Sequence, residues 1–188
     1  MCVTFGTVIP RLRDLPLRDT MTPVLRRLAE RDYELLVATD EETAADWPEL
    51  SRYAHRIGRI PMAQVLPSCD LLVSHGGQGS VLAALAAGCP QLLLPQFDDQ
   101  FDNADMVERA GAGLCVTPDL ITPDLVAGHV EALVEDAVCT ARAAGLAEEI
   151  RRQPPLSRTV DLLTRLAGPG SPRGPGPGTS NVRATSGV

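Results

Sequence analysis

A glycine-rich run between two apolar segments is the part of the sequence best suited to chemistry. Residues 74–80 read SHGGQGS, and they follow the strand-like residues 70–73 and precede the helix-like residues 81–87. The first N–H groups of a helix have no partner within it, and the helix dipole favours an anion there. Glycine lets the backbone approach a ligand closely, and His75 adds a donor that can carry charge near neutral pH. The pattern indicates a phosphate site; the alternative, a plain helix-start turn with Ser80 in its first turn, does not require His75.

Two shorter segments could extend such a site. Gly6 and Thr7 end an apolar segment, and their N–H groups and the Thr7 hydroxyl could donate to a phosphate, although a plain strand-to-loop turn fits equally well. Ile60 precedes Pro61, which favours an extended backbone. Ile60 could therefore form a shelf for a planar base and read the base edge through its backbone, with core packing as the alternative.

Acidic and amide side chains gather in residues 95–103 (PQFDDQFDN). Asp99 and Gln100 offer acceptors and a donor side by side, which suits neighbouring sugar hydroxyls. Acidic residues are also common at helix N-caps, and this alternative fits the segment equally well. A third interpretation is a metal site at Asp98, Asp99 and Asp102. It is weaker, because no histidine lies nearby and a helix start already favours acidic residues.

Short apolar strands alternate with helices along the chain, and this order predicts how the candidate residues are positioned. We expect strands at residues 2–7, 34–39, within 53–60, at 71–74, 91–94 and 113–116. We expect a loop at 8–19, a helix that begins at Thr22-Pro23 with Pro at N1, a short helical turn at 61–66, a helix at 103–110, another from Thr122-Pro123, and two more up to about residue 167.

Such alternation is typical of an α/β fold, here a Rossmann-like parallel sheet of about six strands flanked by helices. Right-handed crossovers would place the loops at Thr7, Ile60, His75 and Gln96 along one edge. Open α/β sheets bind their ligands at that edge.

Length and composition bound the remaining possibilities. The 188 residues suit one domain over residues 1–167, followed by a Gly/Pro-rich tail at 168–188 that we expect to be disordered. A hydrophobic content of 44% supports a core, and aromatic residues at 3% mean that Leu, Val, Ile and Ala must build it. The net charge of −7 argues against nucleic acid or an anionic membrane as the main partner.

The same sequence predicts a cytoplasmic protein. No apolar run approaches the ~20 residues that a membrane span needs, and the N-terminus lacks the pattern of a signal peptide. The 5 cysteines are odd in number and form no CxxC pair, as expected for buried reduced thiols.

Taken together, residues 58–114 closely resemble the donor-binding half of GT-B fold glycosyltransferases. The resemblance rests on GRIP, SHGGQGS, DDQFDNAD and GAGL within that segment, and on the opening VTFGT; it covers roughly residues 1–167. The most similar branch contains bacterial natural-product enzymes of antibiotic biosynthesis, related to the UDP-glucuronosyl- and glucosyltransferases.

The resemblance implies a role for each candidate residue. The diphosphate of a dTDP- or UDP-linked sugar would be held by Thr7, His75, Gly77, Gly79 and Ser80. The nucleobase would contact the backbone of Ile60, and the sugar hydroxyls would bind Asp99 and Gln100. The implied reaction transfers a sugar, a deoxyhexose by this branch, from a nucleoside diphosphate to a hydroxyl of a small-molecule natural product. It is inverting and requires no metal and no cofactor.

One part of the family pattern is missing. An N-terminal domain of similar size binds the acceptor and supplies the general base in this family, whereas Met1 here stands directly before the first donor-domain strand. No catalytic residue can be assigned, and we expect the isolated domain to be inactive. The partners implied are the nucleotide sugar, the missing acceptor domain or a partner subunit, and a second copy, if an exposed apolar face drives dimerisation. Two alternatives remain: a non-catalytic subunit that binds a nucleotide sugar, and, ranked below it, a sugar-nucleotide epimerase.

Overall fold

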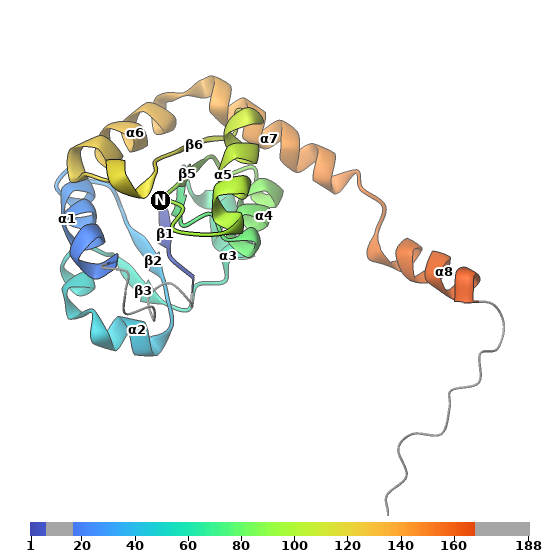
Figure 1. Cartoon of the computed structure of the whole chain (residues 1–188), viewed down its shortest axis with the longest axis horizontal. Coiled ribbons are helices and arrows are strands. Elements are labelled where there is room, and N and C mark those ends of the chain that lie inside the picture. The colour runs from blue at the N-terminus through green and yellow to red at the C-terminus, as the bar shows by residue number, and fades with distance from the viewer. Residues whose placement is uncertain (7–16, 168–188) are drawn as a thin grey trace, which may run out of the picture. The chain divides into compact units, whose positions relative to one another are not determined.

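A parallel six-stranded sheet forms the centre of this computed structural model, which describes residues 1–6 and 17–167 (Figure 1). The strand order is β3-β2-β1-β4-β5-β6. The strands are β1 (Cys2–Thr4), β2 (Leu36–Ala38), β3 (Arg56–Gly58), β4 (Leu72–Ser74), β5 (Gln91–Leu93) and β6 (Gly113–Cys115). The expected Rossmann-like sheet of about six strands is therefore confirmed.

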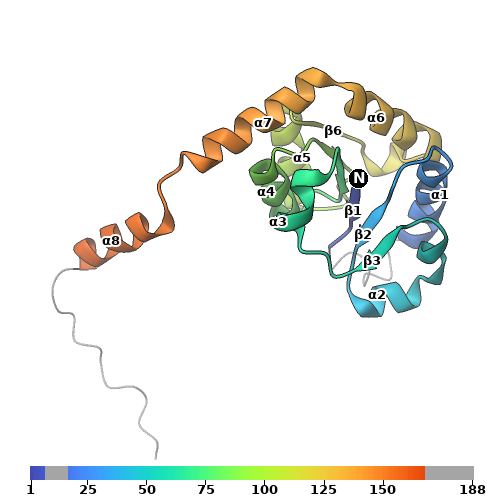
Figure 2. The same ribbon diagram turned by 180° about the vertical axis from the view of Figure 1, so that it is seen from behind.

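Helices cover both faces of the sheet (Figures 1 and 2). They are α1 (Leu17–Ala29), α2 (Glu41–Asp46), α3 (Met62–Val65), α4 (Gln78–Ala87), α5 (Asp99–Arg109), α6 (Pro123–Glu135) and α7 (Ala137–Arg151), with 3-10 turns η2 (Pro48–Arg52), η3 (Leu66–Ser68) and η4 (Pro118–Leu120). Helices α1 and α6 pack together on one face, while α3, α4, α5 and α7 lie on the other.

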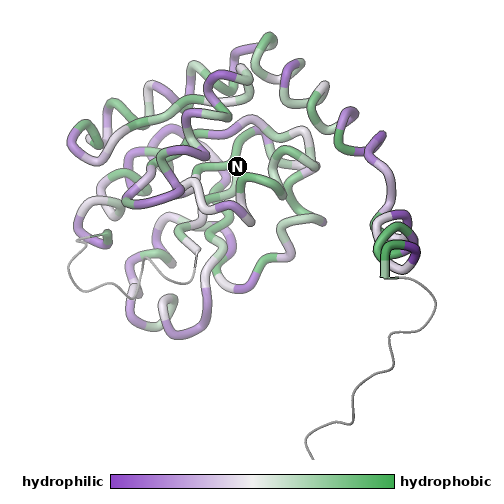
Figure 3. The backbone as a smooth tube through the Cα atoms, turned by 45° about the vertical axis from the view of Figure 1, so that its right-hand side comes forward, coloured by the Kyte–Doolittle hydropathy of each residue, from purple (hydrophilic) through white to green (hydrophobic). Residues whose placement is uncertain are grey.

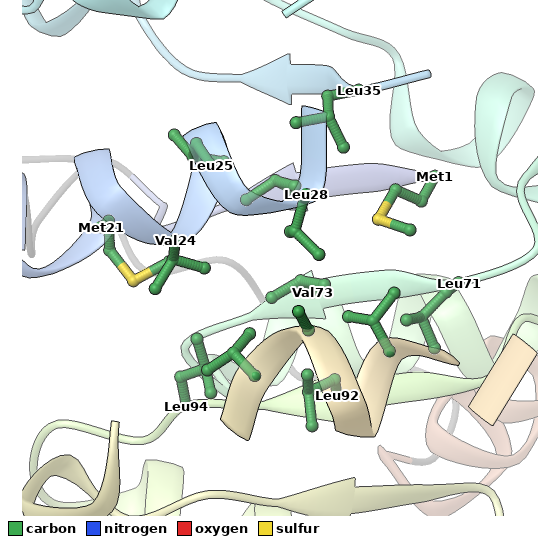
Figure 4. Packing of buried hydrophobic residues seen from close by; sticks show 14 of the residues in the cluster. Met1, Met21, Val24, Leu25, Leu28, Leu35, Leu71, Val73, Leu92 and Leu94 are labelled. Atoms are coloured by element: carbon green, nitrogen blue, oxygen red, sulfur yellow. The ribbon is translucent and has the colours of Figure 1, made fainter. Parts of the chain in front are cut away.

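The core has two sides because successive strand residues point to opposite faces. Val73 and Leu92 lie on the side of α1 and α6, and Figure 4 shows them in the same layer as Leu25 and Leu28 of α1. Leu93 packs on the other side with residues of α4 and α5. Figure 3 shows hydrophobic residues along the central strands and an alternating pattern on the outer helices. The buried residues are mainly aliphatic, as the low aromatic content required.

The start of α1 differs from the sequence prediction. The helix begins at Leu17 rather than at Thr22-Pro23, and Pro23 lies inside it. Leu17 and Met21 are 8% and 1% exposed, and they continue the apolar stripe of Val24 and Leu28 towards the N-terminus. Burial of that extra turn outweighs the hydrogen bond that Pro23 cannot donate. The sequence prediction assigned residues 8–19 to a loop, so its last three residues are helical.

A second unit follows the one that contains the sheet. The first unit comprises Met1–Arg152, and the second begins at Gln153 and contains α8 (Leu156–Ala167). The sequence prediction of one domain over residues 1–167 includes this helix, and it stays a prediction. Helix α8 exposes the large side chains Leu156, Val160, Leu162, Leu163 and Leu166. The tail predicted at 168–188 lies outside the described residues.

None of the helices in the described part of the chain combines the length and the apolar character that a bilayer crossing demands.

Gln91 at the start of β5 offers a test of how this core is stabilised. Its side chain is 0% exposed, and within the described residues neither Oε1 nor Nε2 has a hydrogen-bond partner. An unsatisfied buried amide costs about 1–3 kcal/mol. Gln91→Met replaces the amide with an apolar chain of similar size, so the free energy of unfolding should rise by about 1 kcal/mol. Thermal denaturation should show an increase in Tm of roughly 2–4 °C.

The same substitution at Gln96 is the matched control. Its Nε2 donates to the carbonyl oxygens of Leu94 and Pro95 at 3.0 and 3.2 Å, so Gln96→Met loses made hydrogen bonds and should not raise Tm. A fall in Tm for Gln91→Met would contradict the interpretation of Gln91.

Candidate functional site

The carboxyl ends of β1 and β4 mark the point at which the order of the strands in the sheet reverses. These two strands are neighbours, with Thr4 opposite Ser74. The chain leaves β1 towards β2 on one side and leaves β4 towards β5 on the other. Such a topological switch point opens a crevice outside the strand ends, where open α/β sheets bind ligands.

Each of the two strands ends in a turn of the same kind. The Gly6 N–H donates to Thr4 Oγ1 and the Gly76 N–H donates to Ser74 Oγ, each at 3.2 Å. Both glycines have positive φ, 67° and 80°, which a residue with a side chain adopts only at a cost. The two hydroxyls therefore close matching tight turns at neighbouring strand ends of the switch point.

His75 is the middle residue of the second turn, and its imidazole packs against Gly6 and Gly77. A Cβ atom at Gly6 would lie 2.9 Å from His75 Cε1, and one at Gly77 would lie 2.3 Å from His75 Nε2. No larger residue fits at either position without moving the ring. The side chain is 9% exposed, and its Nδ1 has no partner in the described part of the chain.

Burial controls the charge of His75. Desolvation lowers the pKa of the imidazole below its ordinary value of 6.5, while the nearby Thr4 backbone and the negative charge of Asp99 act in the opposite direction. At neutral pH the ring is therefore mainly neutral. An anion placed against it would favour the protonated form.

The N-terminus of α4 completes the turn after His75. Gly77 is the N-cap and supplies no side-chain cap, so the helix start is open. The Ser80 N–H is already engaged, since it donates to the Gly77 carbonyl at 3.0 Å, so a contact of Ser80 with a ligand would come from its hydroxyl. A Cβ atom at Gly79 would meet no atom within 4 Å, so the surface there is free.

A pocket of about 660 Å³ lies beyond the ends of β1, β2 and β3. Ile60 lines it together with Thr4, Gly6, Ala38, Thr39, Asp40, Arg59, Pro61 and Met62. Asp40 also caps α2, where its carboxylate accepts the Thr43 N–H at 2.8 Å. Ile60 is 9% exposed, so the structure combines the two interpretations of this residue, packing and pocket lining.

The loop after β5 and the first turn of α5 form the other side. Asp98 has a φ of 50°, which is rare for a residue with a side chain, and it turns the chain into α5. Asp99 is exposed, whereas Gln100 is 4% exposed and its Oε1 accepts the Gln96 N–H at 2.9 Å. Asn103 Nδ2 donates to the Gly76 carbonyl at 2.9 Å, which joins α5 to the glycine turn.

The structure brings most of the predicted site residues to one edge. His75, Gly77, Gly79 and Ser80 lie in one turn, and Asp99 is close enough to act on the pKa of His75. Thr7 lies outside the described residues, and its role stays a prediction. The roles of the other predicted residues as ligand contacts also stay predictions; these residues are Ile60, His75, Gly77, Gly79, Ser80, Asp99 and Gln100.

Sequence reasoning missed the hydroxyls of Thr4 and Ser74 at the strand ends, and it missed Asn103. The signal for the hydroxyls was present, because TFG at residues 4–6 and SHG at 74–76 repeat one pattern. No signal singled out Asn103 among the polar residues of α5. Within residues 1–6 and 17–167 no group of three or more His, Cys, Asp or Glu side chains could hold a metal ion, so nothing there supports the metal interpretation of the aspartates.

Residues 22–166 match the family described as the erythromycin biosynthesis protein CIII-like, C-terminal domain. The chain belongs to this family. Its fold is that of the C-terminal half of a GT-B glycosyltransferase, as the resemblance implied.

Three similar proteins illustrate the relationship. L-demethylnoviosyl transferase of Streptomyces niveus is 36% identical over 158 residues, which cover 82% of this chain and 40% of that protein. Aklavinone 7-beta-L-rhodosaminyltransferase of Streptomyces galilaeus is 30% identical over 183 residues, covering 96% and 41%. The structure of spinosyn rhamnosyltransferase SpnG complexed with thymidine diphosphate has a TM-score of 0.72 at 29% identity, covering 86% and 44%. This member of the family thus spans about two fifths of the length of the relatives that it matches.

The glycine at position 77 should be required by His75 rather than by the helix. In Gly77→Ala the new Cβ would overlap His75 Nε2, so the ring must move towards solvent and its pKa should rise towards 6.5. Gly79→Ala is the matched control, because its Cβ meets no atom within 4 Å. Titration of the His75 ring by NMR checks both variants. An unchanged His75 pKa in Gly77→Ala would show that the ring is not held by this contact.

The lowered pKa of His75 also predicts a pH dependence of stability. Below about pH 6.5 the unfolded chain protonates this histidine, while the folded chain resists protonation until the lower folded pKa is reached. The stability present at higher pH is therefore partly lost as the pH falls through that window. His75→Gln removes the titrating group, so Tm should fall less steeply from pH 7.5 to 5 than in the unaltered chain. Parallel Tm profiles would contradict the burial effect.

Proposed function

We propose that this chain is the donor-binding domain of a glycosyltransferase that uses a nucleoside diphosphate sugar. The sugar, a deoxyhexose by analogy with the relatives, would pass to a hydroxyl of a small-molecule natural product with inversion and without a metal ion. The observation that carries the proposal is the switch-point turn, which places a buried histidine beside an open helix N-terminus.

The dimensions and chemistry of the site suit the three parts of such a donor. The pocket of about 660 Å³ at Ile60 has room for a nucleoside. His75, Ser80 and the first N–H groups of α4 would hold the diphosphate, and Thr7 is proposed on the opposite side. Asp99 is exposed at the far end of the turn and would accept hydrogen bonds from sugar hydroxyls, with Gln100 proposed beside it.

The residues of this chain would act mainly on the leaving group. An acceptor oxygen attacks C1 of the sugar from the side opposite the diphosphate, the bond from C1 to the phosphate oxygen breaks, and its electron pair stays on the diphosphate. The dipole of α4 and a hydrogen bond from His75 would stabilise the charge that develops there. The proton of the acceptor hydroxyl must go to a general base, which we assign to an acceptor-binding domain outside these residues.

Nucleotide binding tests the proposal. Isothermal titration calorimetry with dTDP and with UDP should detect binding of at least one of them to the full chain. His75→Ala should weaken that binding at least about tenfold, roughly 1.4 kcal/mol, because the diphosphate loses a charge-assisted donor. Absence of binding by both nucleotides at millimolar concentration would refute a donor site in this chain.

His55→Ala provides the control, because His55 is an exposed histidine that pairs with Glu34 and lines none of the pocket at Ile60. Its affinity for the nucleotide should equal that of the unaltered chain. The wider activity is tested by adding an acceptor-binding domain of a relative with an acceptor and a dTDP-sugar. Release of free dTDP together with a glycosylated acceptor supports transfer, whereas interconversion of the sugar would support an epimerase.

A further inference from the structure

A single side chain ties the first turn of α5 to the glycine turn after β4. Asn103 Nδ2 donates to the Gly76 carbonyl at 2.9 Å and to Asp99 Oδ2 at 3.3 Å. Both partners can only accept hydrogen bonds, so the amide nitrogen must face them and the carboxamide oxygen must face away. One NH₂ group thus uses both of its hydrogens to join two segments that are far apart in sequence.

The two segments are in direct contact at this point. A Cβ atom at Gly76 would lie 3.0 Å from the carbonyl oxygen of Gln100, so the backbone of the turn packs directly against the backbone of α5. Gly76 is the residue after His75, so its carbonyl belongs to the same turn as the imidazole. A hydrogen bond to that carbonyl therefore sets the position of α5 relative to His75.

The same amide restricts the carboxylate of Asp99. Asp99 is exposed, and an exposed aspartate without a partner samples several rotamers. The bond from Asn103 engages Oδ2 and selects one orientation, in which Oδ1 is left for another donor. The negative charge of Asp99 acts on His75 across the turn, so the two side chains belong to one connected arrangement.

We propose that Asn103 is a positioning residue of the donor site: it orients the Asp99 carboxylate towards the sugar and fixes its place relative to the diphosphate turn. Asn103 itself contacts neither the nucleobase nor the sugar. This inference rests on the proposed function, and it concerns only how the site distinguishes a nucleotide sugar from the free nucleotide.

The experiment compares the Kd values of dTDP and dTDP-glucose, and of UDP and UDP-glucose, for the full chain by calorimetry. The readout is the ratio of the two Kd values within the nucleotide pair that binds. Asn103→Ala should change this ratio by about threefold to tenfold in the same direction as Asp99→Ala, since Asp99→Ala removes the hydrogen bond to the sugar and Asn103→Ala removes the contact that orients it. In the double variant the two effects should not add, because Asn103 acts through Asp99.

Two further variants separate positioning from a general loss of structure. Asp102→Ala truncates the adjacent, exposed residue on the same helix and should leave the Kd ratio unchanged. Asn103→Asp keeps the size of the side chain but places an acceptor against two acceptors, so it should reproduce the effect of Asn103→Ala even if the alanine variant is unstable. A merely structural role would weaken both members of a pair equally and leave the ratio constant.

The outcomes distinguish this inference from the function on which it rests. If neither nucleotide pair binds to the unaltered chain, the donor site is wrong and the inference fails with it. If the nucleotides bind but the Kd ratio is insensitive to Asn103→Ala, to Asn103→Asp or to Asp99→Ala, the inference alone is overturned. Additive effects of Asn103→Ala and Asp99→Ala would also overturn it.

Discussion

The arrangement of the candidate site depends on the contact of the His75 ring with Gly6 and Gly77. The ring can occupy that position only if β1 and β4 are neighbours and both chains turn away on glycine, because a Cβ atom at Gly77 would lie 2.3 Å from Nε2. The Thr4 and Ser74 hydroxyls hold these turns, and they sit opposite each other in the strand register. The position of the His75 ring thus depends both on the order of the strands and on the glycine turns that end them.

The electrostatics of the site are local. The chain carries a net charge of −7, yet the switch point presents an open helix N-terminus and a histidine. Burial lowers the pKa of His75, so the ring carries little charge until an anion is present to compensate for its desolvation. Asp99 supplies part of that compensation from the other end of the turn. The site therefore holds a mainly neutral ring rather than a permanent buried cation.

The sequence was a good guide to the sheet and to the glycine turn, and a poorer guide where long-range packing decides. Apolar runs of strand length and the SHGGQGS segment each have a local physical cause, so both were predictable. The start of α1 was not, because Pro23 is a local stop signal that the burial of Leu17 and Met21 overrides. In α5 the sequence offers several polar side chains in succession. Which of them reaches Gly76 depends on the turn at Asp98, whose φ of 50° no local rule requires.

The two sides of the site differ in how they can change. The pocket at Ile60 is lined by strand-end residues whose backbone is fixed by the sheet. The His75 ring leaves no room for a side chain at Gly6 or Gly77. The side around Asp99 is built from side chains on the first turn of α5, which Asn103 joins to the glycine turn at Gly76. Substitutions on that turn can alter the groups that we propose to face the sugar without disturbing the sheet edge. Under the proposed function, relatives named for different sugars would keep one nucleotide-binding frame, provided that the link between α5 and the glycine turn is retained.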